Sequence, residues 1–178
     1  FGLNILIVED KAVNSKILSL MLKNMGCHSE IATNGIEALK IFEELSNKKE
    51  ISKCYNNIAA IYHQEGDYEK AIELYQKSLK FAIELSNKKD IAKCNANIGN
   101  IYNEQGNYKE AMVCFFGSLK IYEELGDKLN ISICFSSIAN VLESIKLYDK
   151  ALSYYQNALN IEAEMGDSLG VADEFNNI

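Results

Sequence analysis

The side chains in this chain best suited to binding chemistry are amides, and their spacing is regular. Asn57 and Asn97 lie 40 residues apart, and Asn100 and Asn140 are separated by the same interval. A side-chain amide can donate a hydrogen bond to a peptide backbone and accept one from it. If the interval is a structural repeat, these amides form a ladder along which an extended peptide could bind.

Other polar residues occupy neighbouring positions in the same segments. The candidate peptide-binding residues are Lys53, Asn56, Asn57, His63, Lys93, Asn97, Asn100, Asn103 and Asn140. Asparagine is also an ordinary residue on a polar helix face, so a merely solvated surface is the alternative interpretation.

Residues suited to catalysis or metal binding are sparse. The two histidines, His28 and His63, have no histidine, cysteine or carboxylate at metal-ligand spacing. No Ser/His/Asp set, Cys/His nucleophile or glycine-rich phosphate loop is present in the sequence. We therefore expect a protein that is not an enzyme and uses no metal or other cofactor.

Cysteine usage points to packing. Three of the five cysteines, Cys54, Cys94 and Cys134, recur at the 40-residue interval, and no Cys-x-x-Cys pair occurs. This predicts one tight helix-packing position in three successive repeats, in preference to a disulfide or a metal site. Reduced thiols suit a cytoplasmic location.

The elements that would position these residues are repeated helical hairpins. Residues 56–90, 96–130 and 136–170 align with one another, and each contains two apolar stripes at helical spacing. In the first repeat the stripes are separated by Gly66 and Asp67, where glycine can end one helix and aspartate can cap the next. Hairpins of this kind stack because none can bury its apolar face alone.

The recurring positions resemble the tetratricopeptide repeat. The shared pattern is a small residue and an aromatic on the first helix, then Gly, Tyr, Ala and an aromatic: Ala59, Tyr62, Gly66, Tyr68, Ala71 and Tyr75. The period exceeds the usual length of about 34 residues and is similar to the long-helix variety in kinesin light chain and bacterial signalling proteins. Lys146 replaces the glycine in the third unit, and a partial fourth unit begins at Gly170. The resemblance implies a solenoid whose first helices line a concave face, with asparagines that hold a peptide there.

The N-terminal residues follow a different pattern. An apolar run, Leu3–Val8, precedes the acidic pair Glu9 and Asp10, which predicts a buried parallel strand with two carboxylates at its end. The expected order is strand, helix, strand, helix, at residues 3–8, 13–25, 27–33 and 36–45.

These residues resemble part of a two-component receiver domain of the hybrid histidine kinase type. The match is carried by residues 5–14, 25–27 and 32–39. In that family the residues at Glu9 and Asp10 help to hold Mg²⁺ beside a phospho-accepting aspartate. The acceptor, the switch residue and three strands are missing here, so we expect the acidic pair to be solvated and the remnant to be unable to accept phosphate.

The two patterns meet in one helix. Residues 38–45 lie one period before residues 78–85 and match them, so helix 36–45 would serve both parts. We therefore predict a mainly α fold: a small βαβα receiver fragment over residues 1–45 and a tetratricopeptide solenoid over residues 46–178, of about three hairpins plus a partial fourth.

The charge balance restricts the partners. A net charge of −7 with interspersed signs argues against a nucleic-acid or anionic-membrane surface, and no apolar run is long enough to span a bilayer. The strand at Leu3–Val8 would expose an unpaired edge, which predicts a homodimer through that edge.

The sequence thus favours a non-enzymatic scaffold for a protein or peptide in a signalling context. Two alternatives stay open. The N-terminal part could be a receiver that is completed in trans and then phosphorylated, or the chain could be an engineered chimera without a native function.

Overall fold

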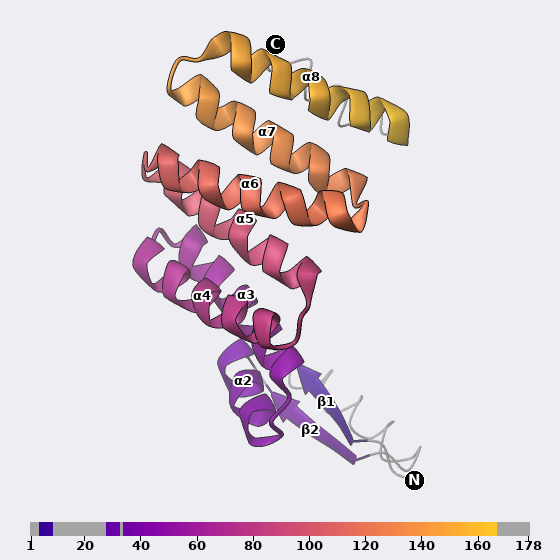
Figure 1. Cartoon of the computed structure of the whole chain (residues 1–178). Coiled ribbons are helices and arrows are strands. Elements are labelled where there is room, and N and C mark those ends of the chain that lie inside the picture. The colour runs from indigo at the N-terminus through magenta and orange to yellow at the C-terminus, as the bar shows by residue number, and fades with distance from the viewer. Residues whose placement is uncertain (1–3, 9–27, 33, 167–178) are drawn as a thin grey trace. The chain divides into compact units, whose positions relative to one another are not determined.

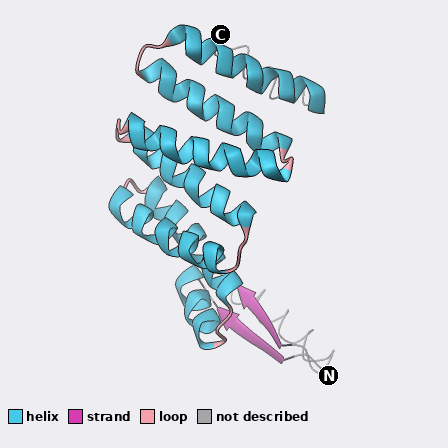
Figure 2. Ribbon diagram, in the orientation of Figure 1, coloured by secondary structure: helices cyan, strands magenta, loops and turns pink. Residues whose placement is uncertain are grey.

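The computed structural model describes residues 4–8, 28–32 and 34–166, which form two strands and seven helices (Figures 1 and 2). The chain divides into two compact units, the first ending at Phe81 and the second beginning at Ala82. Each unit is therefore described by itself. No helix in the described part is long and apolar enough to cross a membrane.

The first unit begins with two paired strands. β1 (Asn4–Val8) and β2 (His28–Ala32) run parallel, with Asn4 opposite His28 and Val8 opposite Ala32. The strands lie within the ranges that the sequence pattern assigned to them. The expected helix over residues 13–25 and the acidic pair Glu9 and Asp10 fall outside the described residues.

Three helices follow, α2 (Gly35–Glu44), α3 (Lys48–Gln64) and α4 (Tyr68–Glu84). α2 begins at Asn34, whose side-chain oxygen accepts a hydrogen bond from the Glu37 backbone N–H. The Tyr55 hydroxyl on α3 donates to the Glu43 carboxylate on α2 over 3.1 Å. α2 therefore packs against α3, as expected for a helix in phase with the repeats.

The second unit is a stack of helices joined by short turns: α5 (Lys88–Glu104), α6 (Tyr108–Leu125), α7 (Lys128–Ser144) and α8 (Tyr148–Met165). In Figure 1 these helices run in alternating directions, each beside its neighbour in sequence. The prediction of a helical-hairpin solenoid is confirmed for this part of the chain.

Every helix end carries a residue in the left-handed conformation. These residues recur every 20 positions: Ser46, Gly66, Ser86, Gly106, Gly126, Lys146 and Gly166. Glycine adopts positive φ without a steric penalty, whereas a side chain at this conformation costs about 1–2 kcal/mol. Lys146, with φ of 62°, therefore keeps the turn that a glycine forms in the other repeats.

The residue after most of these turns caps the next helix. The side-chain oxygens of Asn47, Asn87 and Asp127 each accept a hydrogen bond, 3.3 Å long, from the backbone N–H three residues later. Such a cap satisfies one of the N–H groups left open at a helix start. Asn107 before α6 and Leu147 before α8 hold this position without a side-chain bond.

The core of the second unit is built from small residues set between large ones. Ala92, Ala111 and Ala139 are fully buried beside Phe115 and Ile138. Small side chains allow the backbones of paired helices to approach closely, and the larger ones fill the remaining space.

The cysteine prediction is confirmed at two of its three positions. Cys94 and Cys134 are buried free thiols, whereas Cys54 is only half-buried. The Cys134 sulfur lies 3.7 Å from the Ser118 hydroxyl, which in turn donates to the Ala92 carbonyl over 2.8 Å. These thiols thus belong to a helix seam, and burial raises the pKa of Cys134.

A serine pair forms the corresponding seam in the first unit. The Ser52 hydroxyl donates to the Ser78 carbonyl over 3.0 Å, and the Ser78 hydroxyl donates to the Ser52 carbonyl over 2.8 Å. Both serines are almost fully buried. Each hydroxyl is therefore satisfied where α3 and α4 meet, and the pair fixes their register.

Candidate functional site

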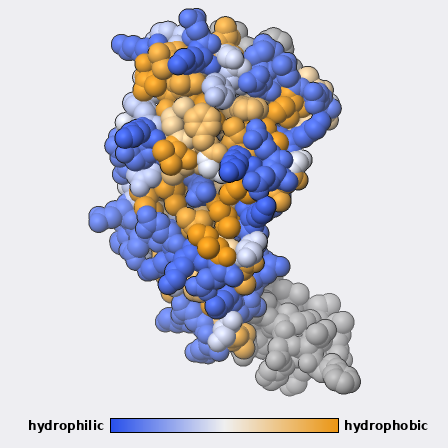
Figure 3. Space-filling model, viewed as in Figure 1, coloured by the Kyte–Doolittle hydropathy of each residue, from blue (hydrophilic) through white to orange (hydrophobic). Residues whose placement is uncertain are grey.

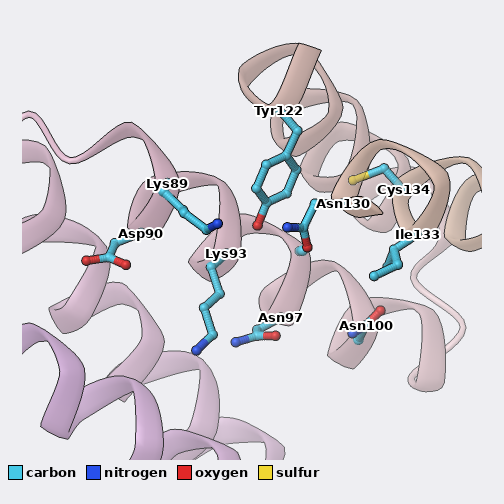
Figure 4. A pocket seen from close by; sticks show the side chains of 10 residues that line it. Lys89, Asp90, Lys93, Asn97, Asn100, Tyr122, Asn130, Ile133 and Cys134 are labelled. Atoms are coloured by element: carbon cyan, nitrogen blue, oxygen red, sulfur yellow. The ribbon is translucent and has the colours of Figure 1, made fainter. Parts of the chain in front are cut away.

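A pocket of about 400 Å³ opens between α5 and α7 in the second unit. Its lining residues are Lys89, Asp90, Lys93, Ala96, Asn97, Asn100, Tyr122, Asn130, Ile133 and Cys134 (Figure 4). Three of the candidate peptide-binding residues, Lys93, Asn97 and Asn100, are among them. The pocket lies on the first helices of two hairpins, α5 and α7.

The α5 wall is polar because of helical spacing. Lys93, Asn97 and Asn100 are separated by four and three residues, so their side chains emerge from one face of the helix. Figure 4 shows them in a row along α5. Such a row presents one cation and two amides to whatever enters the pocket.

The charges in the pocket are unequally compensated. The Lys89 ammonium lies 3.0 Å from the Asp127 carboxylate, and this hydrogen bond is the main reason that the pKa of Asp127 is lowered. The Asp90 carboxylate accepts a hydrogen bond from the Asn87 amide. Neither Lys93 nor Asp90 forms an ion pair within residues 34–166, so the lining carries one unpaired positive and one unpaired negative charge.

The floor of the pocket holds a buried tyrosine from the end of α6. Tyr122 is 4% exposed, and its hydroxyl points from α6 into the space between α5 and α7 (Figure 4). Burial raises the pKa of Tyr122 to about 12, so the hydroxyl is protonated at neutral pH and can donate a hydrogen bond.

On the α7 side the pocket is lined by Asn130, Ile133 and Cys134, whereas the α5 side carries charged and amide side chains. Ile133 is 50% exposed, and Leu129, one turn earlier and outside the lining, is 51% exposed. Lys93 and Lys89 hold the corresponding positions of the preceding repeat. The two walls therefore offer different chemistry, which suits a ligand that carries both polar and apolar groups.

The sequence analysis missed both Tyr122 and Ile133. Ile133 had a readable signal, because an apolar residue at a position that is lysine in two earlier repeats breaks the pattern of the groove face. The sequence signal for Tyr122 was weaker. The same repeat position is occupied by residues of different chemistry: Ala82, Tyr122 and Glu162.

Two candidate residues of the second unit lie outside this pocket. The Asn140 side-chain oxygen accepts a hydrogen bond from the Tyr155 hydroxyl, which also lies 3.0 Å from the Glu143 carboxylate. Asn103 is half-buried, and its side-chain oxygen has no hydrogen-bond partner in the described residues. The pairing of Asn100 with Asn140 in one ladder therefore stays a prediction.

The remaining candidates belong to the first unit. Asn57 is exposed, Lys53 pairs with Glu50 at 2.8 Å, and the His63 ring packs edge-on against Tyr68 with centroids 5.9 Å apart. Each of these side chains is placed on α3, within the first unit.

The expected outward orientation of Asn56 is wrong. Asn56 is 7% exposed, because it follows Ser52 by four residues and precedes Ala59 by three. All three share the buried face of α3, and one residue step of about 100° separates this face from that of Asn57.

The described part of the chain contains no group of three or more metal-ligating side chains. What it contains is a stack of helical hairpins with a mixed polar and apolar pocket on its first helices. That combination defines a helical-repeat protein of the kind that holds partners on its concave side.

A match to a family model of the sequence identifies the family. The model of the tetratricopeptide repeat matches residues 12–84 and 90–163, and the chain belongs to this family. The first matched segment extends into the residues that resemble a receiver domain. No curated protein sequence matches the chain.

Solved structures share the fold at low sequence identity. BtubC (BKLC) from P. vanneervenii is 24% identical, with a TM-score of 0.67 over 75% of this chain and 56% of that chain. Aspartyl phosphate phosphatase F from Bacillus subtilis is 20% identical, with a TM-score of 0.74 over 79% of this chain and 37% of that one. The tetratricopeptide domain of Arabidopsis FLU is 20% identical, with a TM-score of 0.60 over 64% of this chain and 95% of that chain. The chain thus spans about half or less of the first two proteins.

Proposed function

We propose that this chain is a non-enzymatic scaffold that binds an extended peptide segment of a partner protein in the pocket between α5 and α7. The observation that carries the proposal is the convergence of Lys93, Asn97 and Asn100 in one pocket opposite the exposed Ile133 side chain. Amides can pair with a peptide backbone in either direction, and Ile133 can contact an apolar side chain of the peptide.

Replacement of Asn97 and Asn100 together by alanine tests the groove. Peptides selected by the parent chain from a random display library should bind the double variant at least about tenfold more weakly, because two or more hydrogen bonds are lost. Fluorescence anisotropy of the labelled peptides measures the change.

The matched control replaces Asn157 and Asn160, which are exposed on α8 and lie outside the pocket. This variant should bind the selected peptides as the parent does. Equal affinity of the parent and the Asn97/Asn100 double variant would place the binding surface elsewhere.

We also propose that residues 1–45 are a fragment of a receiver domain that gives the scaffold a signalling context in the cytoplasm. The parallel pairing of β1 and β2 and the helix α2 that follows support this origin. In this proposal the repeat array over residues 46–178 takes α2 as its first packing surface. The homodimer through Leu3–Val8 stays a prediction, and light scattering of the purified chain tests it.

The alternative function, phosphorylation of the receiver part, has a direct test. Incubation with acetyl phosphate and Mg²⁺, read by intact mass, should leave the mass unchanged, because the sequence offers no acceptor at the end of a third strand. A mass gain of one phosphoryl group that disappears in the Asp10→Asn variant would replace the remnant with a working site.

A further inference from the structure

The outer face of α6 carries apolar side chains that α4 and α8 lack. Val113 is 68% exposed and Phe116 is 41% exposed. The residues at the same two repeat positions are polar on the other second helices: Glu73 and Gln76 on α4, and Ser153 and Gln156 on α8. Figure 3 shows hydrophobic residues gathered around α6 on the visible face. The repeat itself therefore does not require this apolar surface.

Helical spacing extends the surface into one stripe along α6. Its members are separated by four, three, four and three residues, so they share one side of the helix: Lys109, Val113, Phe116, Lys120 and Glu123. All five are exposed. The first and last members lie about 21 Å apart along the helix axis. The stripe thus has an apolar centre, a cation at one end and a carboxylate at the other.

The charges at the two ends of the stripe are not used within the described part of the chain. Neither Lys109 nor Glu123 forms an ion pair within residues 34–166. The hydrogen bond from Lys88, at 2.8 Å, is the main cause that lowers the pKa of Glu124, and Lys120 adds a smaller effect. Lys120 is therefore close to an acidic group, whereas the two end charges are available for a partner.

A glycine lies beside the apolar centre of the stripe. Lys77 and Asn157 hold the position of Gly117 in the neighbouring repeats. A Cβ at Gly117 would meet only Asn95 Nδ2, at the ordinary distance of 3.7 Å, so internal packing does not exclude a side chain. Glycine inside a helix is unfavourable relative to alanine. Its presence leaves room next to Val113, one turn earlier, for a bulky group of a neighbouring molecule.

The order of the charges along the stripe indicates which molecule covers it. Lys109 and Glu123 each lie seven residues from Phe116. A second copy that runs antiparallel, with a two-fold axis at Phe116, therefore places Lys109 of each copy opposite Glu123 of the other. Val113 then faces the aliphatic stem of Lys120. A parallel pairing would set like charges opposite each other, and an antiparallel pairing centred between Val113 and Phe116 would oppose Lys109 to Lys120.

We propose that the α6 stripe is an interface between two copies of this chain, which cross antiparallel at Phe116 and form two ion pairs between Lys109 and Glu123. Tyr154 on α8 extends the apolar contact, because its ring meets Phe116 edge-on with centroids 6.4 Å apart. No member of the stripe lines the pocket between α5 and α7. The dimer thus presents two pockets, and a partner that carries two binding segments gains affinity from both.

Sedimentation equilibrium of the full chain over a concentration series tests the apolar centre. The parent chain should dimerise. Phe116→Gln and Val113→Ser introduce the residues that α8 carries at these positions, and each should raise the dissociation constant at least about tenfold. The matched control Leu129→Lys changes an exposed apolar residue of α7 to the residue of the preceding repeat and should leave the constant unchanged.

Exchange of the end charges tests the register. Lys109→Glu and Glu123→Lys each place like charges opposite each other, and each substitution acts twice across the axis, so the dissociation constant should rise about tenfold. The double variant restores opposite charges in both pairs and should dimerise as the parent does. Lys49→Glu, which changes an exposed lysine on α3, is the matched control and should have no effect.

The outcomes separate this interface from the other proposals. A parent chain that stays monomeric overturns the inference. A dimer that tolerates Phe116→Gln and both single charge changes forms elsewhere, for example through Leu3–Val8, which also overturns it. Weakening by the single changes without rescue in the double variant overturns the register centred on Phe116. The Phe116→Gln variant should bind the selected peptides as the parent does, so the groove function is judged independently of the dimer.

Discussion

The Phe115→Ala variant should lose about 3–5 kcal/mol in the free energy of unfolding of the second unit. Phe115 is 1% exposed and lies in the buried cluster with Ile138 and Tyr155. Truncation removes the ring and leaves a cavity that the small neighbours Ala111 and Ala139 cannot fill. Urea unfolding followed by far-UV circular dichroism measures the loss.

The neighbouring residue provides the matched control. Phe116 is 41% exposed and contacts Tyr154 edge-on with centroids 6.4 Å apart. Phe116→Ala removes the same atoms from a partly exposed site, so its cost should be clearly smaller, about 1 kcal/mol. Similar losses for the two variants would show that the register of α6 is not the one described.

The repeat period made the hairpins predictable from sequence alone. Gly66 and Gly106 predict helix ends with a left-handed residue. The same positive φ recurs every 20 residues, even where Ser86 or Lys146 stands in place of glycine. Because neighbouring turns and packed helices hold each turn in place, a non-glycine residue is tolerated there at a modest cost. A search for glycine alone would have missed these turns.

The groove was predictable in part. The positions of Lys93, Asn97 and Asn100 follow from helical spacing once the first helix of each hairpin is known. Asn56 was misplaced because a polar residue type was taken as a sign of exposure, whereas the 3.6-residue period puts it beside Ser52 on the buried face. At that position the helical period determines burial, and the residue type does not.

The floor of the pocket could not be derived from one sequence. Tyr122 comes from the end of a second helix, and only the stacking of α6 between α5 and α7 brings it to the residues of the first helices. Its repeat position also varies in chemistry, so self-comparison of the chain gives no rule for it. Only the three-dimensional arrangement shows that Tyr122 and Lys93 line the same pocket.

Gly99→Ala should destabilise the second unit by about 1–3 kcal/mol, although alanine is the better helix former. A Cβ at Gly99 would lie 2.8 Å from Phe115 Cε1 and 3.1 Å from Cys114 Cβ. Phe115 is almost fully buried, so its ring has little room to move. Urea unfolding of the variant measures the net effect.

Gly117→Ala on α6 is the matched control for the gain in helix propensity when alanine replaces glycine. A Cβ there meets Asn95 Nδ2 at 3.7 Å, an ordinary contact, so the substitution should stabilise the chain by about 0.5–1 kcal/mol. If Gly99→Ala stabilised the chain as well, the close approach of α5 to the Phe115 ring would be contradicted.

A double-mutant cycle then attributes the Gly99 effect to one contact. Phe115→Leu removes the ring atoms that the new Cβ would meet, so adding Gly99→Ala to that variant should cost less than adding it to the parent. We expect a coupling free energy of about 1 kcal/mol or more in favour of the double variant. Additive effects would mean that the penalty at Gly99 arises from Cys114 or the backbone. The coupling would instead show that glycine at this position is required by the ring that forms the centre of the second unit.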